Sequence, residues 1–365
     1  MGIGDEDWAV LRSMFPKGWE EEAETSGALS RMRGFESADA LLRTILLHVA
    51  RGYSLRETAV QARAVGLARV SDVALLKRLR NSEDWLRNLC VSLLGESGIV
   101  ISNSGSGRSV RLVDGTIVRE PGKTGSLWRL LYCLQLPTLL CDFFDLTSRQ
   151  GAGNGESLSR IPVQPGDLIL ADAGYCRPPS IDHVVRHQAD VIVRVNWATL
   201  PISHSGNGSR ISLLELLRQL DEPGQAGDWG VSVIGPDGPI VGRVCALLKS
   251  QTAIESSQAK VRRRASKTMK EMRPETLEYA KYVTVFTTWK NAAPAQILEW
   301  YRVRWQIELA FRRLKSLAQL GHLPKYDQAS SRAWLYGKLF VALLSQKMMR
   351  VGREFSPWGY YFVSK

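Results

Sequence analysis

Residues 110–116 read VRLVDGT and residues 167–174 read DLILADAG. Each stretch is a short, mainly apolar run that ends in an aspartate followed by a small residue. Such a run predicts a β-strand buried on both faces, where an ionised carboxylate must reach water, a partner or a cation. If the two strands are neighbours, Asp114 and Asp172 meet at one edge of the sheet. For either aspartate alone, a turn or cap residue after a strand explains the pattern equally well.

Further strand patterns surround these two stretches. The runs WRLLYCLQLP (128–137), LLCDFFDLTS (139–148), ADVIVRVNW (189–197) and YVTVFTT (282–288) are rich in β-branched, aromatic and aliphatic residues, which predicts strands. The run SIDHVVRHQ (180–188) predicts a helix. Three successive strands followed by strand, helix and strand indicate a mixed sheet with helices packed on it, an α/β fold of the mixed α+β kind.

A helix predicted over residues 294–317 contains the sequence WYRVRWQIELAFRRLK. At about 100° per residue, one face is apolar and packs on the sheet. The opposite face carries Tyr301, Arg304, Glu308, Arg312 and Lys315. This face is either part of a binding site or a solvated surface with an Arg304–Glu308 pair at four-residue spacing.

Residues 197–281 follow a less regular pattern, with short β-like pieces separated by Gly and Pro. This pattern indicates an insertion into the sheet domain. The segment ends in the densest cationic run of the chain, which is either a solvated helix face or a phosphate-binding surface. The run contains Lys260, Arg262, Arg263, Arg264, Lys267, Lys270 and Arg273.

The N-terminal third is helical in pattern from about residue 37 to residue 94. Ser54 and Glu57 have the spacing of a capping box, which predicts a helix start. The predicted helix over residues 73–89 is basic, so it is either a helix-turn-helix-like DNA contact or part of an ordinary helical subdomain. The Ser/Gly-rich run at 101–109 predicts a linker, with a domain boundary near residue 105.

The composition favours a polyanionic partner, because the chain has 48 Lys and Arg against 36 Asp and Glu, a formal charge of +12. No apolar run is long enough to span a membrane, and the N-terminus lacks a signal-peptide pattern. We therefore expect a cytoplasmic protein with no membrane partner. The five cysteines contain no CxxC pair, which argues against a disulfide framework and a zinc site.

Three motifs in one order resemble those of bacterial insertion-sequence transposases of the insertion-sequence-four family. The spacing Tyr301-x2-Arg304-x3-Glu308-x6-Lys315 is similar to the Y-R-E-K signature of that family. VDGT and LADAGY look like its first and second aspartate motifs. The similarity extends from roughly residue 105 to 320 and includes GSLWRL (125–130), GES (155–157) and PGDLILAD (165–172).

The resemblance implies an RNase H-like catalytic core with a β-rich insertion, preceded by an all-helical N-terminal domain that binds DNA ends. We expect the helical domain at residues 1–104 and the first part of the core at 105–196. The insertion is expected at 197–281, and the last part of the core with C-terminal helices at 282–365.

The resemblance also implies the site and the reaction. Asp114, Asp172 and Glu308 would bind two Mg²⁺ ions, for which Mn²⁺ substitutes, and would cut and rejoin the ends of a mobile DNA element. The expected partners are double-stranded DNA, both terminal repeats and target, and a second copy of the chain. The residues expected to contact DNA are Tyr301, Arg304, Arg312, Lys315, Arg262, Arg263 and Arg264.

Relatives bend the DNA end into a hairpin and stack a flipped base on an aromatic ring. Tyr282 is the residue expected in that role, and Trp289 is the nearby alternative.

Two other functions remain open: a catalytically degenerate DNA-binding protein and a stand-alone RNase H-like nuclease. The intact acidic residues argue against the first, whereas the short C-terminal part argues for it. The Y-R-E-K spacing argues against the second.

Overall fold

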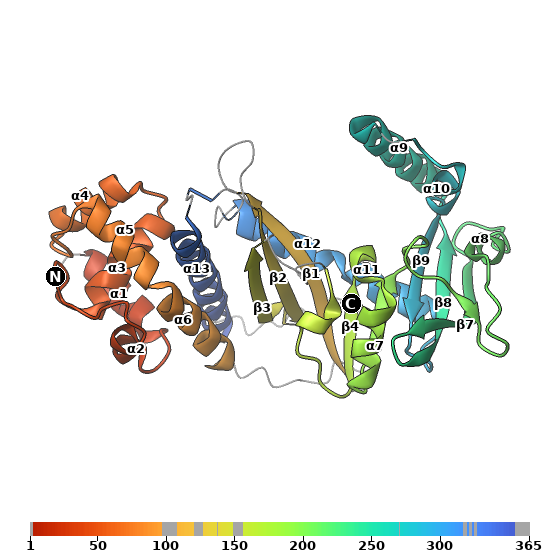
Figure 1. Ribbon diagram of the computed structural model, residues 1–365, viewed down its shortest axis with the longest axis horizontal. Helices are drawn as coiled ribbons and strands as arrows, with labels where there is room; N and C mark the ends of the chain where they lie inside the picture. Colours follow the sequence, from red (N-terminus) through yellow and green to blue (C-terminus); the bar gives the residue numbers. More distant parts are fainter. Residues whose placement is uncertain are drawn as a thin grey trace.

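The structure is a computed structural model of the 365-residue chain. It describes residues 3–96, 108–119, 127–136, 138–148, 156–269, 271–316, 320, 323–324 and 327–354. Along the longest axis, N-terminal helices lie at one end, a twisted sheet in the middle, and a group of strands and helices at the other end (Figure 1). None of the described helices is long and apolar enough to cross a membrane.

The described strands form one sheet with the order β3-β2-β1-β4-β5-β9-β8-β7-β6. Strands β1 to β3 are an antiparallel meander, β4 pairs parallel to β1, and β5 pairs parallel to β4. The predicted mixed α/β fold is confirmed. The strands are β1 (Ser109–Arg119), β2 (Leu127–Leu136), β3 (Leu140–Ser148), β4 (Asp167–Ala171), β5 (Asp190–Arg194), β6 (Ser203–His204), β7 (Ala226–Gly235), β8 (Gly238–Leu248) and β9 (Tyr282–Thr287).

The register of the parallel strands brings the two aspartates together. Val113 of β1 pairs with Ala171 of β4. Asp172 follows the last residue of β4, whereas Asp114 lies within β1, which continues to Arg119. The prediction that Asp114 ends a strand is therefore wrong, but the register still makes the two aspartates neighbours where β4 ends. The side chains of β4 are buried along its whole length, as expected of a central strand covered on both faces.

The segment between β5 and β9 adds strands to the far side of the same sheet. β8 pairs antiparallel with β9, and β7 and β6 follow outward. The helices of this segment are α8 (Leu213–Leu217), α9 (Gln251–Thr268) and α10 (Pro274–Tyr279). α9 has no buried residue, and it projects away from the sheet (Figure 1). The domain boundaries at residues 196 and 281 stay a prediction.

The helix predicted over residues 294–317 is interrupted in the structure. α11 (Pro294–Val303) packs on β5, β7, β8 and β9, whereas α12 (Trp305–Ser316) packs on β1. At the break, the N–H of Arg304 donates to Tyr301 and the N–H of Ile307 donates to Arg304, each over three residues. These short-range bonds tighten the turn, so one uniform helical wheel is wrong for this segment.

Described residues 3–96 contain six α-helices and an isolated antiparallel β-bridge between Phe35 and Ala68. The helices are α1 (Ile3–Ser13), α2 (Trp19–Thr25), α3 (Ala38–Val49), α4 (Leu55–Ala64), α5 (Asp72–Asn81) and α6 (Glu83–Glu96). The capping box of Ser54 and Glu57 is present at the start of α4. The helix predicted over residues 73–89 breaks at Ser82, between α5 and α6. The predicted linker at 101–109 lies mostly outside the described residues.

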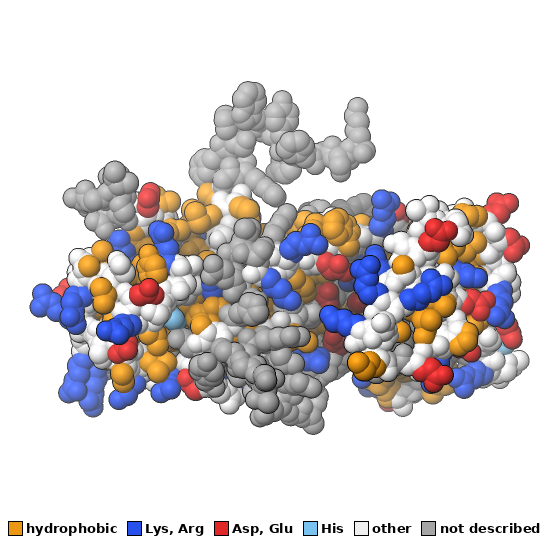
Figure 2. All heavy atoms as spheres, turned by 90° about the horizontal axis from the view of Figure 1, so that it is seen from above, with side chains coloured by type: hydrophobic (Ala, Val, Ile, Leu, Met, Phe, Trp, Pro, Cys, Tyr) orange, Lys and Arg blue, Asp and Glu red, His pale blue; other side chains and the backbone are white. Residues whose placement is uncertain are grey.

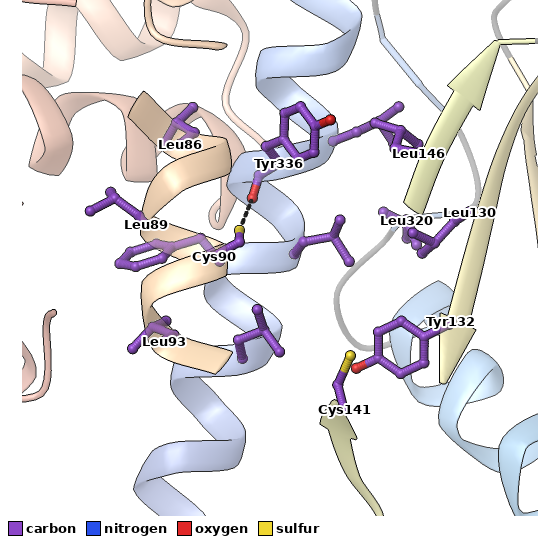
Figure 3. Close-up of a cluster of buried hydrophobic side chains, with 14 of the residues drawn as sticks. Leu86, Leu89, Cys90, Leu93, Leu130, Tyr132, Cys141, Leu146, Leu320 and Tyr336 are labelled. Atoms are coloured by element: carbon purple, nitrogen blue, oxygen red, sulfur yellow. Dashed lines mark hydrogen bonds between the residues drawn. The ribbon is translucent and has the colours of Figure 1, made fainter. Parts of the chain in front are cut away.

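Helix α13 (Gln328–Glu354) joins the N-terminal helices to the sheet. It packs on α6, α5 and α3. Figure 3 shows α6 and α13 side by side, facing the side chains of β2 and β3 across a buried apolar cluster. Within this cluster the Cys90 thiol donates to the Tyr336 carbonyl at 3.4 Å. All five cysteines are buried and unpaired, so they serve as small core residues.

We expect Leu89→Ala to lower the free energy of unfolding by about 2 to 5 kcal/mol, because Leu89 of α6 is fully buried in this cluster. Chemical denaturation followed by circular dichroism measures the change. Val91→Ala on the same helix is the control, since Val91 is 50% exposed. Equal losses in the two variants would contradict the packing of α6 described here.

Candidate active site

Two carboxylates occupy the edge of the sheet where β1 and β4 run side by side. The Asp114 carboxylate accepts a hydrogen bond from the N–H of Gly115 at 2.7 Å. The Tyr301 hydroxyl of α11 donates to the Asp172 carboxylate at 3.3 Å. The Asp114 side chain is only 20% exposed, so its charge is poorly solvated.

The guanidinium of Arg304 lies between two of the predicted acidic residues. Its Nη1 is 3.7 Å from the Asp114 carboxylate, and its Nη2 donates to the Glu308 carboxylate at 2.9 Å. Arg304 is buried, whereas the Glu308 side chain is 57% exposed. The break between α11 and α12 places Arg304 here, so β1 and α12 are linked through one cation.

Burial and neighbouring charges shift the ionisation of this site. Burial raises the pKa of Asp114 to about 6; the Gly115 N–H and Arg304 act against this shift, while Asp172 and Glu156 add to it. The pKa of Tyr301 is also raised, mainly by burial and then by Asp172, against the opposing effect of Arg304. The hydroxyl of Tyr301 therefore stays protonated and able to donate to Asp172.

The exposed part of the predicted polar face lines an open groove of about 510 Å³. Glu308, Arg312 and Lys315 of α12 lie along it, with Thr116 of β1 and Phe311. Tyr301 and Arg304 differ from the sequence-based expectation, because they are buried against the sheet edge and not on the outer surface. The structure thus divides the predicted face into a buried pair and an exposed groove.

The other predicted DNA-contacting residues lie farther along the sheet. Arg262, Arg263 and Arg264 are exposed on α9, and Lys270 lies outside the described residues. Tyr282 begins β9 and is 7% exposed, within the core. Trp289 is also buried, with the Arg108 guanidinium 5.1 Å from its ring centre. A base could stack on either ring only after neighbouring side chains move.

Two further cations, Arg194 and Lys249, were not among the site residues predicted from the sequence. Arg194 ends β5, and its charge acts on Tyr301 and on Lys249. Lys249 is half-buried and donates to the Ser257 hydroxyl at 3.0 Å and to the Ala280 carbonyl at 2.8 Å. Burial, followed by the charges of Arg194 and Lys260, lowers the pKa of Lys249 to about 8. A charged residue closing the apolar run VIVR was the available signal for Arg194.

One face of the molecule carries side chains of both charges. Seen from above, acidic side chains lie near the middle of the face, with Lys and Arg side chains close on both sides (Figure 2). An arrangement of this kind attracts a phosphate backbone while it keeps carboxylates at the point of contact.

The donor chemistry of the sheet edge fits a hard divalent cation, because every candidate ligand is a carboxylate oxygen. Within the described ranges, no three Asp, Glu, His or Cys side chains converge closely enough to hold a metal ion unaided. Arg304 supplies the positive charge between Asp114 and Glu308. A cation here would offset the repulsion by Asp172 and Glu156 that helps to raise the pKa of Asp114.

The raised pKa of Asp114 predicts a pH-dependent stability of the metal-free protein. A folded state with the higher pKa binds the proton more tightly than the unfolded chain, so stability falls as the pH rises from about 4 through about 6. With EDTA present, we expect Asp114→Asn to increase the free energy of unfolding at pH 7.5 by on the order of 2 kcal/mol.

At pH 4 the same variant should show a much smaller increase, because the folded-state carboxyl is then protonated and the unfolded-state carboxyl, with its ordinary pKa of 3.8, is only partly ionised. Denaturant titrations at the two pH values measure this difference, and Asp221→Asn at an exposed position is the control. A gain in stability that is equal at both pH values would exclude ionisation of Asp114 as the cause.

Comparison with known proteins identifies relatives along nearly the whole chain. Residues 148–344 match the family model described as a transposase DDE domain. The putative transposase InsL for insertion sequence element IS186A of Escherichia coli strain K12 is 33% identical, over 98% of both chains. The transposase for insertion sequence element IS421 of Escherichia coli is 32% identical over the same shares.

A more distant relative is the transposase for insertion sequence element IS231F of Bacillus thuringiensis subsp. israelensis. It is 24% identical over 93% of this chain and 79% of the relative.

Proposed function

This chain belongs to the family of insertion-sequence transposases with a DDE domain, and on that premise we propose that it cuts and rejoins DNA at the ends of an insertion sequence. The observation that carries the proposal is the meeting of Asp114 and Asp172 at one sheet edge, with Glu308 linked to Asp114 through Arg304. Membership in this family implies dependence on a divalent metal.

We assign Asp114, Asp172 and Glu308 as the residues that would hold two Mg²⁺ ions, with Mn²⁺ as a substitute. When bound, the ions would activate an attacking oxygen and stabilise the leaving oxygen of a phosphodiester. Tyr301 orients the Asp172 carboxylate through its hydroxyl. Arg304 balances the charge of Asp114 and Glu308 until DNA arrives, and its guanidinium then suits a phosphate.

DNA would lie in the groove beside Glu308, where Arg312 and Lys315 contact phosphates near the cleaved bond. The cations of α9 would hold a more distant part of the duplex. The N-terminal helices are the proposed second DNA contact, within a domain that ends near residue 104. In α5, Arg78 donates to the backbone carbonyls of Ala28 and Arg31. Arg80 of the same helix forms an ion pair with Asp327. Other side chains of these helices would therefore make the DNA contacts.

A functional complex would pair two chains on the two ends of one element, in the bacterial cytoplasm. Base stacking on Tyr282 stays part of the proposal, with the condition that its buried ring becomes accessible.

The cleavage test uses a supercoiled plasmid that carries the two ends of the element, with Mg²⁺. We expect Glu308→Gln to slow cleavage more than about 100-fold while end binding is retained, since the lost stabilisation amounts to several kcal/mol in the transition state. Glu299→Gln on the exposed face of α11 is the matched control. Gel separation of excised, nicked and hairpin products measures the reaction.

Binding without cleavage by the wild type would instead support a degenerate DNA-binding protein. Hydrolysis without joining would support a stand-alone nuclease. Cleavage at the wild-type rate by Glu308→Gln would remove Glu308 from the proposed site.

The role of α9 can be measured through salt dependence. Replacing Arg262, Arg263 and Arg264 by alanine should reduce the slope of log K against log salt by about 2 to 3, because each phosphate contact contributes about 0.9. The triple lysine variant is the control, since it keeps the charge and should keep the slope. Fluorescence anisotropy with a labelled end duplex gives both values. An unchanged slope in the alanine variant would place DNA elsewhere.

A further inference from the structure

The carboxylate of Glu156 lies against the backbone that follows the second aspartate. A Cβ added to Gly174 would be 1.7 Å from Oε2 of Glu156. Only a glycine at this position leaves room for the carboxylate where it now lies. Gly174 is two residues after Asp172, within the short 3₁₀ turn Ala173–Tyr175. Glu156 therefore reaches the sheet edge that carries the candidate active site, although it is distant in sequence.

The local fold fixes the backbone next to Glu156. The neighbouring Ser157 begins a 3₁₀ turn, and its hydroxyl lies 3.4 Å from the buried Ser180 hydroxyl at the start of α7 (Pro178–Arg186). The N–H of Leu158 donates to the same Ser180 oxygen at 3.3 Å. Arg160 pairs with Asp145 of β3 at 2.6 Å. These contacts hold the segment against two elements of the core.

A buried hydroxyl faces the same place without a partner. Tyr175 is 1% exposed, and its hydroxyl makes no hydrogen bond to the residues that the structure describes. The hydroxyl oxygen lies 3.2 Å from the position that a Cβ on Gly115 would take, beside Asp114. The charges of Asp114 and Glu156 act on it. An unpartnered buried hydroxyl costs about 1 to 3 kcal/mol, so this position calls for a ligand.

We propose that Glu156 and the Tyr175 hydroxyl form a further side of the candidate active site, where they bind the hydration shell of the divalent cation held by Asp114 and Asp172. This inference rests on the proposed function. The Glu156 carboxylate would accept hydrogen bonds from water, and the Tyr175 hydroxyl would use a water molecule as its missing partner. Both side chains act as positioning residues, and neither reacts with DNA.

Gly174 provides a test that leaves Glu156 chemically intact. Its φ lies outside the left-handed region, so alanine is compatible with the backbone, and the three atoms nearest to the added Cβ belong to the movable carboxylate of Glu156. Gly174→Ala should displace the carboxylate without removing it. Glu156→Gln removes the charge and leaves the side chain in place. The two variants therefore affect one contact in different ways.

The experiment measures Mn²⁺ binding to the DNA-free protein by electron paramagnetic resonance. We expect Glu156→Gln and Gly174→Ala each to weaken binding about tenfold, because loss of an outer-sphere partner typically lowers metal affinity 10- to 100-fold. The double variant should be no weaker than either single variant, since both act on one contact. Glu215→Gln, at an exposed position of α8, is the control for net charge.

Tyr175→Phe separates ligand binding from a structural role. Without metal, its melting temperature should equal or exceed that of the wild type, because an unpartnered hydroxyl has been removed. The rise in melting temperature on adding Mn²⁺ should be smaller than in the wild type. A structural hydroxyl would give the opposite pattern, with a lower melting temperature without metal and an unchanged rise.

Asp114→Asn distinguishes failure of this inference from failure of the proposed function. If Asp114→Asn abolishes Mn²⁺ binding but Glu156→Gln and Gly174→Ala bind as tightly as the wild type, Glu156 has no part in the site. If Asp114→Asn also binds normally, the proposed metal site itself is wrong. Additive losses in the Gly174→Ala, Glu156→Gln double variant would likewise overturn the shared contact.

Discussion

The guanidinium of Arg304 lies between carboxylates that come from distant parts of the chain, Asp114 within the first strand and Glu308 on a late helix. Two buried or half-buried acids near one another repel strongly unless a cation accompanies them. Arg304 supplies this cation from the helical segment that packs on the sheet. The break between α11 and α12 turns Arg304 inward and leaves Glu308 exposed on the next helical turn. The irregularity of this helix is thus tied to the charge of the site.

The sheet provides the other half of the same constraint. Parallel pairing of β1 with β4 aligns Val113 with Ala171, so Asp114 inside β1 is next to Asp172 at the end of β4. An antiparallel pair would have placed their ends at opposite edges. Small residues then let other groups approach: the Tyr175 hydroxyl packs close to Gly115, and the Glu156 carboxylate packs on Gly174. The strand register brings Asp114 and Asp172 together, and Gly174 allows the Glu156 carboxylate to approach them.

The strands around the site could be predicted because their apolar runs are short and bounded by charged or small residues. In the N-terminal region, Ser54 and Glu57 correctly predicted the start of a helix. The residues alone left Asp114 and Asp172 as either ligands or turn residues, and the family resemblance favoured ligands. Helical periodicity missed the break at Arg304, because counting at a fixed angle assumes an unbroken helix. Glu156 was missed as a site residue for a different reason. The GES match (155–157) marked this stretch as similar to the family but gave Glu156 no role. Its position depends on the contacts of Ser157 and Leu158 with Ser180 and on its own contact with Gly174, which join parts of the chain that are distant in sequence.

A site rich in carboxylates repels the phosphates of DNA. Cations offset this repulsion in two places: on α9, away from the site, and in the groove beside Glu308. The arginines of α9 are exposed, so their attraction acts through solvent and is screened by salt beyond about 8 to 10 Å. Arg312 and Lys315 line the groove beside Glu308, and Lys249 is half-buried near Arg194. Arg312 and Lys315 are exposed like the arginines of α9, whereas Lys249 is partly buried. Because partly buried charges are screened less, salt should weaken the attraction of the exposed cations for DNA more than that of Lys249.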